Sequence, residues 1–332
     1  MLGYQSQLEA TQSRTTIMSH FAPDWAEFIE QLGEPLTFEG TTLEELTNKW
    51  ENHLAPKFMA ICQYPPLDTS VTTEDITLEN IWVRIYTSPS ATGNEPVGVF
   101  MHGGGWIMGS VDQEDMPCRE RSKANHMKIV SIGYRLAPKW KFPTALDDCV
   151  QGTLWAISHL SLSRFVLMGG SAGANLAFGV ALRLVDAGLG DKIKGVMALV
   201  PAVVHPDAVP ADKKPLYTSW WENADRTINT LTTMETFVSL YDPNPHDPYF
   251  SSLLHPRLKD LNKVYIVECG ADTLRDDARL MKQALEEVKV PLLYDAYDGY
   301  PHYSWMFPAP VLKRHVEEFN VNLTRALEWL NE

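Results

Sequence analysis

Three side chains suited to nucleophilic catalysis occur along the chain in the order serine, aspartate, histidine. Ser171 stands in the stretch GGSAG, Asp272 follows the apolar run KVYIVECG, and His302 follows the run PLLYDAY. A serine hydroxyl is a weak nucleophile until a histidine accepts its proton, and that histidine needs a carboxylate to orient it. The order therefore predicts a nucleophile, an orienting acid and a general base.

The sequence around Ser171 is typical of a sharp turn between a strand and a helix. The apolar run RFVLMG ends at two glycines, and the helical pattern AGANLAFGVALRLVDAG begins directly after the serine. Glycines permit the unusual backbone angles of such a turn, which exposes the hydroxyl at the edge of a sheet. The start of the helix also favours negative charge. A glycine-rich turn that serves packing alone is the alternative.

Other residues compete for the acid and base roles. Asp276 and Asp277 are rivals of Asp272, but they lie where the next helix begins, so we expect them to cap that helix. Four further histidines follow the serine in the chain: His205, His246, His255 and His315. The first three fall in or just after an irregular stretch, and the fourth lies in the last helical pattern. His302, in a loop after a strand, is therefore the predicted base.

A second glycine-rich stretch, HGGGW, begins at His102 after the apolar run PVGVFM. Adjacent glycines let backbone N–H groups approach a substrate and stabilise a negative oxygen. We expect the N–H groups of Gly104, Gly105 and Ala172 to form this oxyanion hole. Gly103 would shape the loop, and His102 would organise it through hydrogen bonds. A phosphate site is not indicated, because neither GxxxxGK[ST] nor GxGxxG is present.

The elements that position these residues alternate between strand and helix. Residues 1–60 look helical, ITLENIWVRIYTS has a strand pattern, and short buried strands then alternate with helices to the end of the chain. This alternation predicts an α/β protein with a mostly parallel sheet covered by helices on both faces. The carboxyl ends of parallel strands meet at one edge, where the candidate residues would gather.

One segment interrupts the alternation of strands and helices. Residues 202–250 are rich in proline and show no strand pattern. We expect this insertion and the N-terminal segment 1–60 to form a helical cap over a core made of residues 61–201 and 251–332. The alternative is that the insertion packs against the core for structural reasons alone.

Aromatic side chains near the expected mouth of the site are candidates for weak substrate contacts: Trp106, Trp220, Trp221, Tyr303 and Trp305. Aromatic residues near a site fill the protein core as often as they bind ligands. An apolar aromatic cleft would favour a bulky natural-product ester.

Composition disfavours several classes of function. The 332 residues carry a formal net charge of −14 and no basic run, which disfavours nucleic acid and anionic membranes as partners. No apolar run reaches the ~18 residues of a membrane span, and the polar N-terminus lacks a secretory signal pattern. The four cysteines form no CxxC pair and are expected to be reduced and buried. These observations predict a cytoplasmic protein.

Five blocks resemble, in order, those of the hormone-sensitive-lipase-like α/β-hydrolases: HGGGW, YRLAPKWKFPTALDDC, GGSAGAN, DTLRDDA and GYPHYSWMF. The chain is also similar to the fungal branch with versiconal hemiacetal acetate esterase-type enzymes of polyketide pathways. The resemblance implies an eight-stranded sheet with a helical cap, and Ser171, Asp272 and His302 as the catalytic triad. It further implies carboxylic ester hydrolysis without a metal or an organic cofactor. The expected partner is a small-molecule ester or a polyketide-derived substrate, bound by a monomer or a homodimer.

Two positions depart from the family pattern, and other functions stay open. Gly170 replaces the usual aspartate before the nucleophile, and Lys139, followed by Trp140, replaces a glutamate. The same triad in a dry pocket could perform acyl transfer, lactonisation, elimination or cyclisation. A ligand receptor on a hydrolase fold is disfavoured because His302 is present. An amidase would use the same residues, but no feature indicates a peptide cleft.

Overall fold

A single eight-stranded sheet runs through the protein, in the order β1-β2-β4-β3-β5-β6-β7-β8. The computed structural model describes residues 20–34, 36–93, 95–225 and 228–332. Strand β2 is antiparallel to both of its neighbours, and the other neighbouring pairs are parallel. The expected α/β class with an eight-stranded, mostly parallel sheet is confirmed. The strands are β1 (Thr72–Thr77), β2 (Trp82–Thr87), β3 (Val97–Met101), β4 (Lys128–Gly133), β5 (Phe165–Gly170), β6 (Ile193–Leu199), β7 (Val264–Cys269) and β8 (Leu292–Tyr297).

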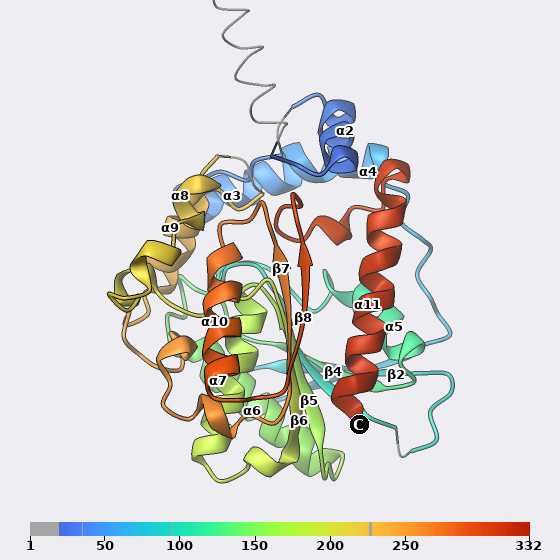
Figure 1. Cartoon of the computed structure of the whole chain (residues 1–332). Helices are drawn as coiled ribbons and strands as arrows, with labels where there is room; N and C mark the ends of the chain where they lie inside the picture. Colours follow the sequence, from blue (N-terminus) through green and yellow to red (C-terminus); the bar gives the residue numbers. More distant parts are fainter. Residues whose placement is uncertain (1–19, 35, 94, 226–227) are drawn as a thin grey trace, which may run out of the picture.

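Helices cover both faces of this sheet. Helices α6, α7 and α10 lie on one face, and α5 and α11 lie on the other (Figure 1). The helices of the core are α5 (Asp115–Ala124), α6 (Thr144–His159), α7 (Ala172–Asp186), α10 (Arg275–Glu287) and α11 (Lys313–Asn331). No helix in the described ranges is both long enough and apolar enough to cross a membrane.

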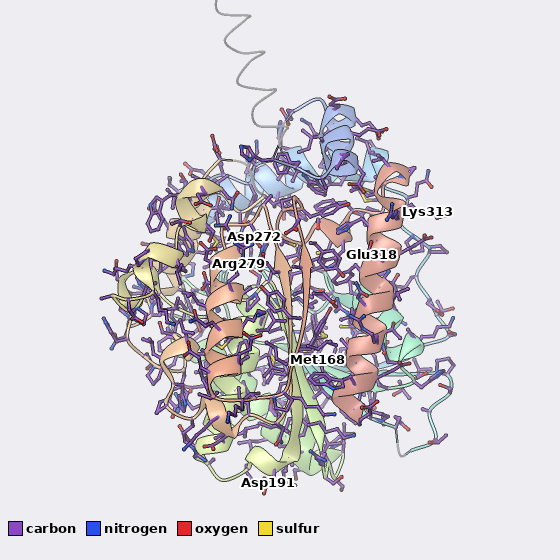
Figure 2. All side chains as sticks on the ribbon, in the orientation of Figure 1. Met168, Asp191, Asp272, Arg279, Lys313 and Glu318 are labelled. Atoms are coloured by element: carbon purple, nitrogen blue, oxygen red, sulfur yellow. The ribbon has the colours of Figure 1, made fainter. Side chains whose placement is uncertain are left out.

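The central strands are buried on both faces because their side chains alternate between two apolar layers. Leu167 of β5 belongs to the layer beneath α6, α7 and α10, whereas its neighbours Val166 and Met168 belong to the layer beneath α11. All six residues of β5 are buried. Figure 2 shows Met168 in the middle of the molecule, Asp272 near the helices at one end of the sheet, and Asp191 at the opposite end. A continuous apolar run therefore becomes a central strand.

The upper end of the sheet in Figure 1 is covered by helices from two distant parts of the chain. The N-terminal segment forms α2 (Pro23–Leu32), α3 (Leu43–Lys49), a π-helical turn (Trp50–Leu54) and α4 (Ala55–Ile61), and the insertion forms α8 (Ser219–Glu222) and α9 (Leu231–Tyr241). A backbone bridge pairs Phe38 with Asn229, and the Thr236 hydroxyl donates to the carbonyl of Gly40 at 2.9 Å. The first 19 residues of the expected cap segment lie outside the described residues.

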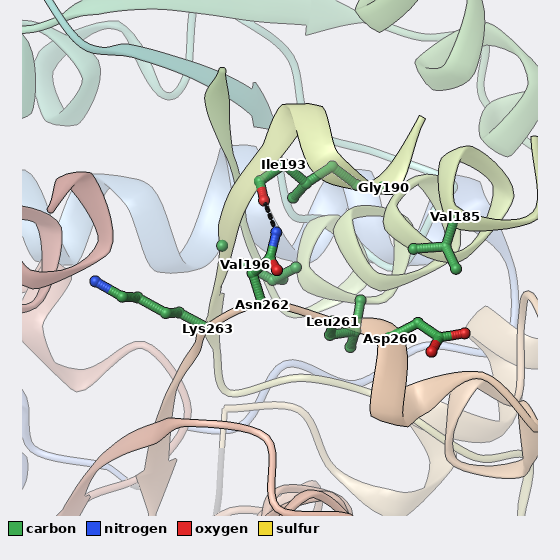
Figure 3. A pocket seen from close by; sticks show the side chains of 9 residues that line it. Val185, Gly190, Ile193, Val196, Asp260, Leu261, Asn262 and Lys263 are labelled. Carbon is green, nitrogen blue, oxygen red and sulfur yellow. Dashed lines mark hydrogen bonds between the residues drawn. The ribbon is translucent and has the colours of Figure 1, made fainter. Parts of the chain in front are cut away.

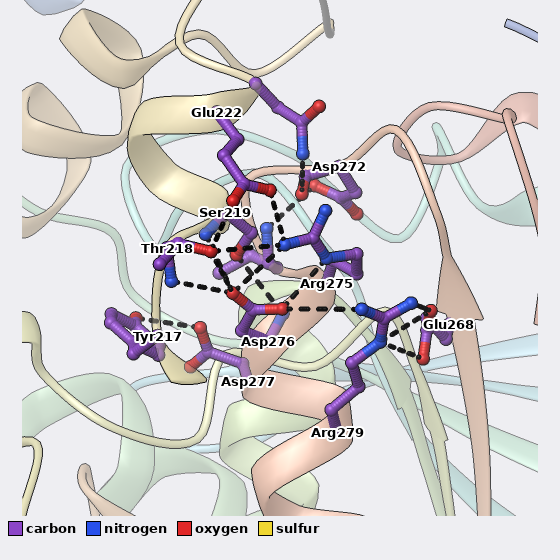
Figure 4. A network of polar contacts seen from close by, with 12 residues as sticks. Tyr217, Thr218, Ser219, Glu222, Glu268, Asp272, Arg275, Asp276, Asp277 and Arg279 are labelled. Atoms are coloured by element: carbon purple, nitrogen blue, oxygen red, sulfur yellow. Dashed lines mark hydrogen bonds and ion pairs between the residues drawn. The ribbon is translucent and has the colours of Figure 1, made fainter. Parts of the chain in front are cut away.

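The insertion is tied to the core through the start of α10 (Figure 4). The Asp276 carboxylate accepts hydrogen bonds from the backbone N–H groups of Thr218 at 2.7 Å and Ser219 at 2.8 Å. Arg275 forms an ion pair with Glu222 of α8 at 2.8 Å, and it also binds Asp276. Two elements that are distant in the sequence are thereby held by charge-assisted hydrogen bonds.

Asp277 forms a second attachment of the same kind. Its Oδ1 accepts from the backbone N–H groups of Val203 at 2.8 Å and Val204 at 3.2 Å, and its Oδ2 accepts from the Tyr217 hydroxyl at 2.8 Å. The expectation that Asp276 and Asp277 cap their own helix is therefore wrong. Leu274, the N-cap residue of α10, forms no side-chain cap, and both carboxylates point toward the insertion.

We expect Asp277→Asn to change how stability depends on pH. Burial raises the pKa of Asp277 from 3.8 to about 7, so its protonated form is favoured in the folded state and its contribution to stability falls as the pH rises through this range. Asparagine keeps the acceptor for Val203 and Val204 but does not titrate. The Tm of the variant, relative to wild type, should rise by about 3 °C or more between roughly pH 5 and pH 8. A constant difference across this range would contradict the prediction.

Candidate active site

Ser171 occupies a strained turn between β5 and α7. Its backbone angles are φ 54° and ψ −121°, a conformation that L-residues adopt only when the surroundings impose it. The surroundings do so through contact: a Cβ on Gly173 would lie 2.1 Å from the carbonyl oxygen of Met101, so helix and strand approach too closely for any side chain. The Ser171 N–H donates to the carbonyl of Leu199 on β6 at 2.8 Å. The hydroxyl is thereby held at the edge of the sheet.

Asp272 and His302 meet at the same edge, at the ends of β7 and β8. The His302 Nδ1 lies 2.6 Å from the Asp272 Oδ2. Asp272 is fully buried, and His302 is 7 % exposed. Ser171 and His302 both line one large cavity. The structure therefore brings the three predicted residues to one end of the sheet, with the aspartate behind the histidine.

Two asparagines of the insertion hold Asp272, and the sequence analysis did not identify them. Asn229 Nδ2 donates to the Oδ1 of Asp272 at 3.3 Å, and Asn223 Nδ2 donates to its backbone carbonyl at 2.9 Å. The backbone N–H of Leu274 adds a third hydrogen bond, to Oδ1 at 3.0 Å. No motif marks these asparagines, because they lie 43 and 49 residues before the aspartate in an irregular segment.

The glycine loop after β3 presents backbone donors to the same cavity. Gly103, Gly104 and Gly105 line the cavity wall. Within the described ranges, the N–H groups of Gly104, Gly105 and Ala172 have no hydrogen-bond acceptor. Gly104 has φ 113°, and a Cβ there would lie 2.2 Å from the carbonyl oxygen of Met108, so no other residue fits. Three unpaired donors therefore lie at or beside Ser171 and the glycine loop.

His102, the residue before the three glycines, contacts this loop through its buried ring. Its ring stacks on Tyr134 at 4.1 Å, and its Nδ1 lies 2.8 Å from the carbonyl oxygen of Gly103. The Tyr134 hydroxyl donates to the His102 carbonyl at 2.8 Å. Burial lowers the pKa of His102 to about 4, so the ring is neutral near pH 7. His102 is thus a buried, stacked ring whose contacts lie on the glycine loop and on Tyr134.

The cavity has a volume of about 960 Å³ and extends under the helices above the sheet. Its upper wall is apolar and comes from both covering segments. It includes Phe38, Trp50 and Phe58 from the N-terminal part, and Ile228 and Phe237 from the insertion. A cavity of this volume and character accommodates a ligand the size of a polycyclic natural product.

The aromatic residues expected near the mouth divide into two groups. Tyr303 and Trp305 line the cavity. The expectation is wrong for Trp106, Trp220 and Trp221, which do not. Trp106 stacks in the core on Tyr241 at 4.9 Å, Trp220 is buried away from the cavity, and Trp221 is 58 % exposed on the surface. Their nearness in sequence to the loop and the insertion did not indicate the direction in which each side chain points.

A second, small hollow lies at the opposite end of the sheet (Figure 3). It is lined by residues such as Val185, Leu261 and Asn262, and the Asn262 side chain donates to the carbonyl of Ile193. It leaves no room for a water molecule and is therefore not a candidate binding site.

Both departures from the family pattern have a structural description. A Cβ on Gly170 would lie 1.9 Å from the Tyr303 hydroxyl, so the tyrosine occupies the space beside the residue that precedes the nucleophile. The Tyr303 hydroxyl is buried and has no hydrogen-bond partner in the described part of the chain. Lys139 lies with its ammonium group 5.3 Å from the Trp140 ring and does not line the cavity. Only the Gly170 departure therefore reaches the site.

Comparison with known proteins agrees with this geometry. Residues 98–306 match a family model described as the alpha/beta hydrolase fold. A versiconal hemiacetal acetate esterase of Aspergillus parasiticus is 49 % identical over 94 % of this chain and 99 % of its own length. The FAD-linked oxidoreductase pytB of Aspergillus terreus is 56 % identical over 99 % of this chain, which spans only 41 % of that longer protein. Among solved structures, vibralactone cyclase has a TM-score of 0.82 and 26 % identity, covering 93 % of this chain and 94 % of its own.

The chain therefore belongs to the α/β hydrolase family. The resemblance to the hormone-sensitive-lipase-like members, and within them to the fungal esterase branch, is confirmed by relatives of 46 % and 49 % identity that bear the name versiconal hemiacetal acetate esterase.

The contact between Gly170 and Tyr303 can be tested by a double-mutant cycle. Gly170→Ala should lower the free energy of unfolding by about 2 kcal/mol, because its Cβ meets the tyrosine hydroxyl. Tyr303→Phe should be neutral or slightly stabilising, because it removes an unpartnered buried hydroxyl. The two changes together should cost at least about 1 kcal/mol less than their sum in urea unfolding. Strict additivity would show that the two residues do not touch.

Proposed function

We propose that the chain is a serine carboxylic ester hydrolase that cleaves an ester of a small polyketide-derived molecule through an acyl-enzyme. The observation that carries this proposal is the 2.6 Å contact between His302 and Asp272 at the cavity that Ser171 also lines. The unpaired backbone donors of the glycine loop support it. The esterase names of the relatives that match over nearly their whole length support the ester as the substrate class.

In this mechanism the three side chains act in sequence on the ester. The Ser171 Oγ attacks the ester carbonyl while the Nε2 of His302 takes the hydroxyl proton. Asp272 accepts the hydrogen bond from Nδ1 and stabilises the imidazolium that forms. His302 then returns the proton to the departing alcohol, and a water molecule cleaves the acyl-enzyme by the same route.

The backbone donors act on the charge that develops during both steps. In each tetrahedral intermediate the former carbonyl oxygen becomes negative, and the N–H groups of Gly104, Gly105 and Ala172 would donate to it. These groups are held by glycine backbone geometry and by the start of α7, so they need no rearrangement when the charge appears. The loss of one such donor typically costs about 3 kcal/mol of transition-state stabilisation.

The covering helices would shape the substrate site. We assign the described part of segment 1–60 and the insertion 202–250 to a cap whose apolar wall binds the bulky part of the ester. The wall residues Phe38 and Phe237 lie close together, with ring centroids 6.3 Å apart, and come from the two cap segments. Tyr303 and Trp305 would form the lower wall of the same site.

The similarity to vibralactone cyclase favours a second candidate, cyclisation through the same triad. In that reaction a hydroxyl of the substrate, instead of water, would attack the acyl-enzyme carbonyl and release Ser171. Turnover in H₂¹⁸O separates the two reactions by mass spectrometry. Hydrolysis places one ¹⁸O atom in the acid product, whereas cyclisation leaves the product unlabelled.

The first test of the esterase proposal is turnover of p-nitrophenyl acetate, butyrate and octanoate. Wild type should hydrolyse at least one of these esters, and Ser171→Ala should lower kcat by about 10⁴-fold or more. Ser131→Ala is the matched control, because Ser131 is also a buried serine but lies outside the cavity. Equal activity of wild type and Ser171→Ala would refute the proposal.

A further inference from the structure

The cavity has a second part that runs down between helices α5 and α11, away from the cap. Helix α11 lines it with Val316, Asn320, Leu323 and Thr324, which recur at the spacing of one helix face. Helix α5 lines the opposite side, beginning at Met116 and Pro117. Both helices cover the same face of the sheet (Figure 1). We call this space the helix lobe; it meets the catalytic region near Tyr303 and Trp305.

Arg121 of α5 is buried in the wall of the helix lobe. It is 7 % exposed, and its Nη1 has no hydrogen-bond partner among the described residues. The guanidinium carbon Cζ lies over the ring of Phe100, 5.3 Å from the ring centroid. Among the described residues, no carboxylate is within hydrogen-bond distance of this Nη1. A buried guanidinium with unused donors is costly unless an acceptor binds it.

The nearby carboxyl groups do not supply that acceptor. Glu114 and Glu120 also line the lobe, and their charges interact with Arg121, but among the described residues neither carboxyl forms a hydrogen bond or an ion pair with the guanidinium. At the outer end, Lys123 and Asp68 pair with each other at 2.6 Å, so their charges cancel. The Nη1 group of Arg121 therefore remains without an acceptor inside the lobe.

We propose that the helix lobe is a substrate subsite in which Arg121 binds an acidic oxygen, a carboxylate or a phenolate, remote from the scissile ester. The Arg121 fork would donate to this oxygen while the α11 residues pack against the attached ring system. This inference rests on the proposed function and narrows its substrate to an extended ester with an acidic group at the far end. An aromatic polyketide provides both features.

The proposal is tested by binding, which does not require turnover. The probes are anthraquinone-2-carboxylate and anthraquinone-2-carboxamide, which share a tricyclic ring system but differ in charge. In Ser171→Ala, calorimetry should show the carboxylate binding about tenfold tighter or more than the carboxamide. Adding Arg121→Met should remove this preference. Arg325→Met, on the exposed face of α11 outside the cavity, is the matched control and should retain it.

A second variant tests the lobe without altering a buried charge. Asn320 lies on the exposed side of α11 at the lobe, so Asn320→Trp should fold normally and block the space. Both probes should then bind at least about tenfold more weakly. Equal binding of the two probes to Ser171→Ala, or a preference that survives Arg121→Met, would overturn the proposal, as would unchanged binding to Asn320→Trp.

The two proposals can fail separately. If wild type is inert on all p-nitrophenyl esters while the carboxylate preference depends on Arg121, the subsite stands and the esterase proposal fails. If wild type hydrolyses these esters but the carboxylate probe binds no more tightly than the carboxamide, the esterase proposal stands and the subsite proposal fails.

Discussion

The turn at Ser171 constrains the rest of the structure. A residue at φ 54° and ψ −121° persists only where its neighbours leave no other conformation, and here those neighbours are a fully buried strand and a buried helix. The approach of α7 to β3 requires glycine at 173, because a side chain there would meet the Met101 carbonyl. The tight packing of the sheet therefore maintains the strained turn that places Ser171 at the cavity.

The insertion contacts the candidate site residues as well as covering the end of the sheet. Asn223 and Asn229 hold the aspartate that faces His302, while Asp276 and Asp277, four and five residues further on, hold the insertion in turn. Because these contacts share a few residues at the start of α10, a shift of the insertion would also disturb the orientation of the histidine. The position of the insertion and the orientation of His302 are thus physically coupled.

Burial determines how strongly the polar groups of the site act. Asp272 is fully buried, and the cavity wall above Ser171 is largely apolar, so charges there are weakly screened. A fixed N–H donor then stabilises a developing negative oxygen more than it would in water.

Local patterns in the sequence predicted much of this protein. The alternation of buried strands and helices predicted a mostly parallel sheet, and the family resemblance added its eight strands. The order of motifs at strand ends predicted three residues that the structure brings to one edge. The three residues meet because parallel strands necessarily place their carboxyl ends at one edge of the sheet. The roles of Ser171, Asp272 and His302 remain predictions until the variants are measured.

Only the tertiary structure decided which distant segments contact the site. The hydrogen bonds from Asn229 to Asp272 and from Tyr217 to Asp277 join residues 43 and 60 positions apart, and no local propensity specifies them. The same holds for the tryptophans, since Trp106 turns into the core while Trp305 faces the cavity. A side chain's type and neighbours set its chemistry, whereas its direction and partners depend on how the whole chain packs.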